Sequence, residues 1–176
     1  VHTTVFESST ALDYAQLADQ ALIEKPQAVL LITSALDAAL LINQLRQQHE
    51  SLIIATAEWP GSGKLVELGG NAVEDVIVAQ YINIQDTSAA FTTFKQAFST
   101  RYGEALSFPA LTAYNATRVV LQGLTEQRDD ETLKQTLLRL RRFDGLQGPI
   151  EFDEFGDTHS PTFITRIHKG QYQRAN

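Results

Sequence analysis

The chain has 176 residues, of which 43% are hydrophobic and 20% charged, so it is long and apolar enough to fold around a core. This composition excludes a disordered, collagen-like or low-complexity protein. With 14 Lys and Arg against 21 Asp and Glu, the net charge is −7, and no basic field is expected to attract phosphate backbones. Nucleic acid is therefore not an expected partner.

Two residue types are absent. The chain has no Cys, which excludes disulfide scaffolds and thiolate metal sites and leaves the cellular compartment open, the periplasm included. It also has no Met and opens on Val1, so we expect a processed form or a fragment. The longest apolar run, residues 28–32, is far too short to cross a bilayer.

The first half of the chain alternates short strands with longer helices. β-branched and aromatic side chains predict a strand over residues 1–6, and residues 8–10 offer an N-cap for a helix that runs from Ala11 to Pro26. Further strands are predicted over residues 27–33, 52–56 and 76–82, with helices after Ser34 and over residues 63–68. This alternation predicts an α/β fold with a parallel, doubly wound sheet.

The alternation ends after Asp86. Helical spacing predicts three consecutive helices over residues 88–102, 109–124 and 129–141, the third capped by Asp129 and Asp130. From Phe143 onward Gly-rich turns separate short strands, and Lys169-Gly170 is expected to form a hairpin turn.

The usual catalytic and cofactor motifs are incomplete or absent. Residues 60–64 resemble a phosphate-binding loop, but Glu58 stands where the motif needs its first Gly, and Leu65 where it needs Ser or Thr. No dinucleotide fingerprint, nucleophile elbow or metal-ligand spacing is present; the four histidines are isolated: His2, His49, His159 and His168. We therefore expect no cofactor, no metal and no catalytic residue.

The end of the third predicted strand carries the clearest candidate site. Ala57, Glu58 and Trp59 follow that strand, where ligands bind in open α/β sheets, and they offer a carboxylate for a cation beside an aromatic wall. Ser34 and Ala35 follow the second strand at a helix N-terminus, which can hold a polar ligand group. A solvated Glu58, a packed Trp59 and a Ser34 that only caps its helix remain equally open alternatives.

Three further segments carry a family resemblance when taken with this site. They are GGNAVED at residues 69–75, the Tyr114-Asn115-Ala116 helix, and GLQGPIEFDEFGD at residues 145–157. In this order the sequence resembles the type I periplasmic binding proteins of the branched-chain amino acid (Leu/Ile/Val) importer family, over essentially the whole chain.

The resemblance implies two α/β lobes joined by crossing segments. Residues 1–84 would then be a second-lobe segment, residues 85–142 a helical segment of the first lobe, and residues 143–176 a crossing segment with terminal strands near the hinge. The chain would start partway into the second lobe, so the N-terminal part of the receptor would be a missing partner.

The resemblance also implies roles for the candidate residues. Glu58 matches an acidic residue that takes the ammonium group of the ligand, Trp59 beside it would line the side-chain pocket together with Ala57, and Ser34-Ala35 would lie in the loop that closes over the ligand. That loop often carries an aromatic residue in the family and has none here, which leaves the ligand open between an amino acid and another small polar molecule.

A binding function without catalysis is thus expected: an exported receptor in the periplasm or on the extracellular face, with a lipid anchor as one option, that delivers its ligand to the membrane permease of an ABC importer. A ligand-sensing regulatory domain of the same fold is the alternative, and an α/β enzyme is a third reading that no catalytic constellation favours.

Overall fold

The computed structural model describes residues 1–8, 12–83, 85–159 and 161–175. The chain divides into two compact units, which are described separately. The sheet unit comprises residues 1–80 and 163–176, and the helical unit comprises residues 81–162.

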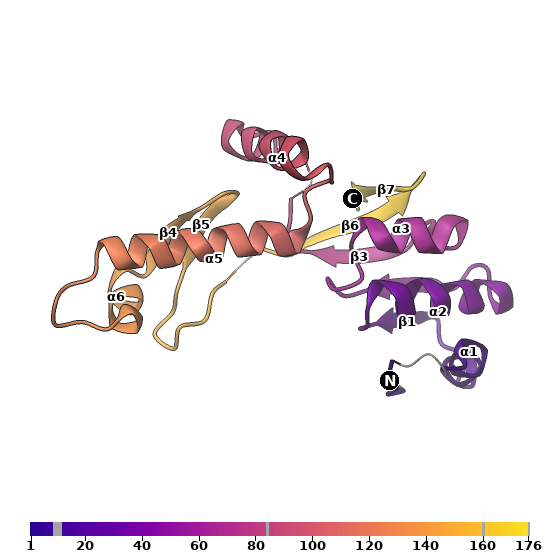
Figure 1. The fold of residues 1–176 in the computed structure, drawn as a ribbon. Coiled ribbons are helices and arrows are strands. Elements are labelled where there is room, and N and C mark those ends of the chain that lie inside the picture. Colours follow the sequence, from indigo (N-terminus) through magenta and orange to yellow (C-terminus); the bar gives the residue numbers. More distant parts are fainter. Residues whose placement is uncertain (9–11, 84, 160, 176) are drawn as a thin grey trace. The chain divides into compact units, whose positions relative to one another are not determined.

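The sheet unit is built on one mixed sheet in the order β1-β2-β3-β6-β7. Strands β1 (Ala28–Leu31), β2 (Ile53–Thr56) and β3 (Ile77–Gln80) are parallel, while β6 (Phe163–His168) pairs with β3 antiparallel and β7 (Gln171–Arg174) closes the other edge. The helices are α1 (Tyr14–Leu22), α2 (Ala35–Gln48), α3 (Gly63–Gly69) and the 3₁₀ turn η1 (Gly70–Val73) (Figure 1). Helical connections between parallel strands confirm the α/β class that the alternation predicts.

The core of the sheet unit lies between α2 and one face of the sheet. Apolar residues recur along α2 at helical spacing and pack with alternate residues of the strands, so both patterns meet in one layer: Ala38, Leu41, Ile42, Leu45, Ile54, Val78 and Ile167. The strand residues between them face the other way, and several are large and exposed: Leu30, Ile53 and Ile164. The second face of this sheet is therefore apolar and largely open among the described residues.

The helical unit contains α4 (Ala89–Tyr102), α5 (Phe108–Thr125) and α6 (Leu133–Leu140), followed by the hairpin of β4 (Arg142–Gly145) and β5 (Gly148–Glu151). Its core joins α4, α5 and the hairpin loop through Ile82, Phe91, Leu111 and Leu146. The Asn115 side chain of α5 accepts a hydrogen bond from the Leu146 backbone N–H at 3.0 Å, which ties the hairpin loop to the helix.

The strand predicted for residues 1–6 is wrong: this segment is irregular and pairs with no strand. In the described chain β1 pairs only with β2, and residues 1–8 do not pair with its free edge; β propensity alone does not form a strand.

Two helix starts also differ. Helix α1 begins at Tyr14 with Asp13 as its N-cap; of the predicted cap residues 8–10, residues 9 and 10 lie, with Ala11, outside the described residues. Helix α6 begins at Leu133, not at 129, because Thr132 and Gln135 form a capping box that satisfies the first backbone N–H groups.

The predicted turn at Lys169-Gly170 is confirmed. Both residues have positive φ, 50° and 72°, and they join the antiparallel strands β6 and β7. The assignment of residues 1–84, 85–142 and 143–176 to lobes stays a prediction; in the structure residues 143–162 belong to the helical unit and residues 163–176 to the sheet unit. No helix among the described residues has the length and apolar character needed to cross a membrane.

Candidate functional site

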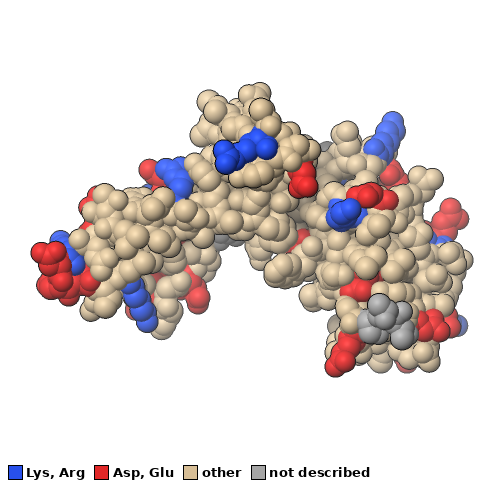
Figure 2. All heavy atoms as spheres, in the orientation of Figure 1, with Lys and Arg blue, Asp and Glu red and all other residues tan. Residues whose placement is uncertain are grey.

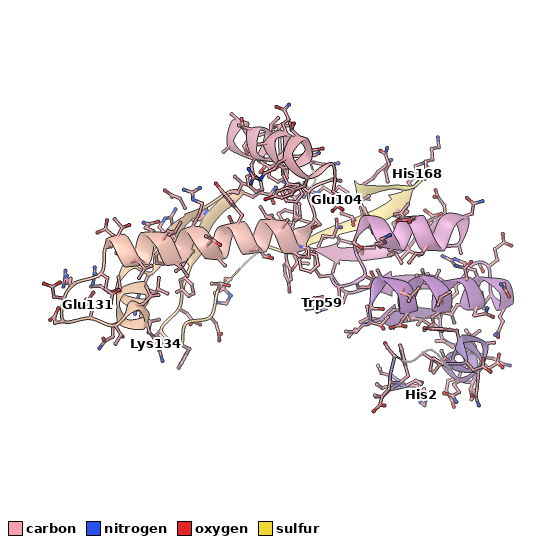
Figure 3. The ribbon with its side chains drawn as sticks, viewed as in Figure 1. His2, Trp59, Glu104, Glu131, Lys134 and His168 are labelled. Atoms are coloured by element: carbon pink, nitrogen blue, oxygen red, sulfur yellow. The ribbon has the colours of Figure 1, made fainter. Side chains whose placement is uncertain are left out.

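A hollow of about 380 Å³ lies in the sheet unit where β1 and β2 end. Its walls are the loop from β1 into α2, residues 32–35, and Trp59 from the turn after β2 (Figure 3). Parallel strands present their carboxyl ends at one edge of a sheet, which is where ligands bind in open α/β folds. Of the predicted site residues, the structure brings Ser34, Ala35 and Trp59 together around this hollow.

A buried carboxylate holds the loop that forms one wall of the hollow. Asp37, in the first turn of α2, is only 3% exposed and accepts hydrogen bonds from the hydroxyls of Tyr14 at 2.7 Å, Ser34 at 2.8 Å and Thr33 at 3.2 Å. The Ser8 hydroxyl donates to the same carboxylate. In return, the Ser34 hydroxyl accepts from the Asp37 backbone N–H at 3.1 Å, so Ser34 does cap its helix.

These hydrogen bonds keep Asp37 ionised. Burial alone would raise the pKa of its carboxyl group, but the hydroxyl hydrogen bonds from Ser8, Tyr14, Ser34 and Thr33 outweigh burial and hold the pKa below its usual value. The hydrogen bond that the Tyr14 hydroxyl donates to the anionic Asp37 raises the pKa of the Tyr14 phenol. A full negative charge therefore lies behind the loop wall.

The other wall is carried by a tight turn. The Gly61 N–H donates to the Glu58 carbonyl at 2.8 Å, and the Gln80 side-chain amide donates to the Gly61 carbonyl at 3.2 Å. The Tyr172 hydroxyl donates to the next carbonyl, that of Ser62, at 2.7 Å. A Cβ atom at Gly61 would lie 2.7 Å from Val78 Cγ1, so the turn approaches β3 more closely than any other residue allows.

Glu58 and Trp59 are neighbours in this turn but differ in exposure. The Trp59 side chain is 71% exposed and lines the hollow, whereas Glu58 is 8% exposed and is not among the lining residues. The charge of Glu58 acts on Tyr172: burial first, and then this carboxylate, raise the pKa of the phenol. Ala57 extends the ladder through its N–H to the Leu31 carbonyl at 3.0 Å and does not line the hollow.

Two buried polar atoms stand near the ends of β2 and β3. Within the residues that the structure describes, Thr56 Oγ1 and Gln80 Oε1 have no hydrogen-bond partner, although both side chains are buried. Buried polar groups are normally satisfied, so these two atoms mark a place where a water molecule or a polar group would bind.

Sequence reasoning missed Asp37, Gln80 and Tyr172. The spacing Ser34-x-x-Asp37 is a helix-start signal that would have singled out Asp37, because a carboxylate at that position can bond the cap residue. Gln80 and Tyr172 have no such local signal, since they reach the turn from strands 19 and 110 residues away in sequence.

Other features of the described residues do not suggest a metal site. In the described part of the chain no group of three or more His, Cys, Asp and Glu side chains is placed to hold a metal ion. Acidic and basic side chains are interspersed on the face shown in Figure 2. A second hollow of about 420 Å³ in the helical unit is mostly apolar and is lined by residues of α6, Lys134 among them, and by Phe152, Phe155 and Gly156.

Comparison with known proteins places the chain in a family. A model of the periplasmic binding protein family matches residues 1–171. The search of curated proteins finds no match.

Among solved structures, the leucine binding protein LivK of Thermotoga maritima matches with a TM-score of 0.85 and 22% identity, over 98% of this chain and 50% of that one. LivJ of Streptococcus pneumoniae, solved with isoleucine, matches with a TM-score of 0.79 and 18% identity, over 93% of this chain and 48% of that one. An ABC transporter solute binding protein of R. palustris, solved with benzoate, matches with a TM-score of 0.79 and 13% identity, over 94% of this chain and 46% of that one.

At these identities the structures show the fold alone, and this chain spans about half the length of each of them. The family match covers nearly the whole chain and agrees with the α/β sheet unit. The chain belongs to the periplasmic binding protein family, as an incomplete type I binding protein.

Proposed function

We propose that this chain is part of an extracytoplasmic solute receptor, the substrate-binding component of an ABC importer, for an amino acid or a similar small polar ligand. The observation that carries the proposal is the hollow at the carboxyl ends of β1 and β2, lined by residues 32–35 and Trp59, in a chain of this family. Solute binding proteins for leucine, isoleucine and benzoate share the fold, which supports a small carboxylate-bearing ligand.

The ligand side chain or ring would lie against the apolar wall of Ile32, Ala35 and Trp59. Glu58 does not line this hollow, so its proposed role as the partner of an ammonium group rests on the family resemblance and requires its side chain to turn toward the ligand. Glu58 is 8% exposed, and a charge with so little water around it gains more from a paired cation than a solvated one does. Removing one partner of such a desolvated pair typically costs about 2 to 5 kcal/mol of binding. Binding rather than catalysis is the function of these residues.

The complete receptor would supply a second wall. This chain spans about half the length of the solved relatives, and the lining residues Ile32 and Trp59 are each 71% exposed. Closure of a second lobe over the hollow would bury them and give the permease a closed shape to recognise. The receptor would lie in the periplasm or on the extracellular face.

The test is calorimetry of the complete receptor against branched-chain amino acids and aromatic carboxylates. Glu58→Gln is expected to raise the Kd of an amino acid at least about tenfold, because the ammonium loses its anionic partner. The control is Glu67→Gln, an exposed carboxylate of α3 paired with Lys64, which should leave the Kd unchanged. An amino acid that binds equally to wild type and to Glu58→Gln removes Glu58 from the site, and a receptor that binds no member of the panel contradicts the proposed function.

A further inference from the structure

We infer that Asp37 is a positioning residue for the ligand: its carboxylate clamps the loop wall of the hollow to the N-terminal segment of the chain, so that residues 33–35 hold one shape opposite Trp59. The ligand part of this inference rests on the proposed function. Asp37 does not line the hollow itself, and it acts through Thr33 and Ser34, which do.

The contacts of Asp37 come from two parts of the chain that are distant in sequence. Thr33 and Ser34 are its neighbours in the loop, whereas Tyr14 and Ser8 are 23 and 29 residues away. The Tyr14 hydroxyl binds Oδ1, and the other three hydroxyls converge on Oδ2. A simple helix cap explains the Ser34 contact but gives no reason for the other three.

The electrostatics favour a rigid arrangement. Asp37 is 3% exposed, so an unpaired carboxylate would be costly there, and each hydroxyl that turns away leaves more of the charge unsatisfied. Hydrogen bonds to a charged acceptor are also stronger than those between neutral groups. The loop hydroxyls are thereby held toward Asp37.

This arrangement changes the role of Ser34. Its hydroxyl donates to Asp37 and accepts from the Asp37 backbone N–H, so it is engaged twice within the protein. The loop therefore meets the ligand through its shape and its apolar neighbours Ile32 and Ala35, and a ligand that needs a hydroxyl donor from Ser34 is disfavoured.

Amide hydrogen exchange on this chain tests the clamp without any ligand. Asp37→Asn is expected to speed exchange at the amides of Asp37 and Ala38, whose N–H groups bond Ser34, at least about tenfold more than at residues 42–46 of the same helix. Loss of global stability would instead speed both groups by the same factor. Asp19→Asn, an exposed α1 carboxylate bonded to Gln48, is the matched control and should change neither group. Equal effects on both groups of amides overturn the inference.

Tyr14→Phe provides a second variant that keeps the charge and removes one distant donor. It is expected to speed exchange at the Asp37 and Ala38 amides as well, and the double variant should add little to Asp37→Asn, because both changes open the same clamp. Additive effects, or no effect of Tyr14→Phe on the loop, contradict a clamp that spans the two segments.

The ligand arm uses the complete receptor and leucine, isoleucine and benzoate as probes. Asp37→Asn is expected to raise the Kd of the bound probe about tenfold through faster dissociation, while the Asp19→Asn Kd stays at the wild-type value. An unchanged Kd despite a loosened loop overturns the inference. If the wild type binds none of the probes, the proposed function fails and the ligand part fails with it; the exchange pattern still decides whether Asp37 fixes the loop.

Discussion

Gly145 stands at a position of the helical unit that leaves no room for a side chain. It faces Gly148 across the first pair of the β4–β5 hairpin, and a Cβ atom at position 145 would lie 2.5 Å from the Gly148 carbonyl oxygen. Ile150 would be 3.0 Å away on the same side. The carbonyl belongs to the paired strand, so neither neighbour can yield without disturbing the hairpin loop that carries Leu146 into the core.

Gly145→Ala is therefore expected to destabilise the protein by about 1 to 3 kcal/mol, the usual cost of forcing an extra methyl group into a packed site. Chemical denaturation followed by circular dichroism measures it. Gly63→Ala is the control, because nothing lies within 4 Å of a Cβ atom there, and its change should stay within about 0.5 kcal/mol. Equal stability of the two variants would show that the hairpin absorbs the methyl group.

Helix α6 depends on an ion pair that reaches back to the turn before it. Arg139 donates to both carboxylate oxygens of Glu131, at 2.7 and 2.8 Å, and Thr136 donates to one of them at 3.0 Å. The Arg139 hydrogen bonds are the largest cause that lowers the pKa of Glu131 from 4.5 to about 2. A carboxylate with a lowered pKa stabilises the fold above its unfolded pKa and loses that effect as the pH falls toward the folded value.

Arg139→Gln is expected to lower the melting temperature at pH 7, and the difference from wild type should shrink as the pH falls from about 4.5 towards 2. Thermal melts at pH 7, 5, 4 and 3 measure this window. Arg128→Gln is the control: Arg128 lies 3.9 Å from the same carboxylate and is mostly exposed, so its loss should change little. A difference that stays constant across the pH series would mean that Arg139 acts by packing alone.

The same elements show what the sequence can predict. Strands β1 to β3 and helices α2 to α5 lie within a few residues of their predicted ranges, because hydrophobic period and Gly or Ser boundaries are local signals. The predicted start of α6 at the acidic pair 129–130 is wrong, although Thr132 and Gln135 carry the capping-box pattern; Asp is also a favoured N-cap residue, so the pair gives a local signal of its own. The strand over residues 1–6 was wrong because pairing is not a local property.

Part of the candidate site can also be predicted from the sequence, and part cannot. The position of the site at strand ends, and Ser34, Ala35 and Trp59 as its walls, follow from topology. The burial of Glu58 and its effect on the pKa of Tyr172 do not, since they depend on a strand more than a hundred residues later in the chain. The Asp37 cluster likewise needs the path of the N-terminal segment, which periodicity does not define.

At the scale of the whole molecule, each unit exposes large apolar side chains among its described residues. The sheet unit exposes Leu30, Ile53 and Ile164 on one face, although parallel strands are normally covered on both sides. The helical unit exposes Val120, Leu121 and Leu124 along α5. The chain spans about half the length of the solved relatives that it matches.

The isolated chain is therefore expected to bind a hydrophobic dye and to self-associate as its concentration rises, because exposed apolar patches of this kind attract one another. Ile53→Thr, which keeps a β-branched residue in β2, should reduce dye binding and association while leaving stability nearly unchanged, since Ile53 is 54% exposed. Ile54→Thr is the matched control on the buried face: Ile54 is fully buried, so the added hydroxyl should destabilise the sheet unit and increase dye binding. Sedimentation velocity and dye fluorescence measure both. A monomer that binds no dye at high concentration would mean that the open sheet face needs no cover, and that this chain is stable in water as it stands.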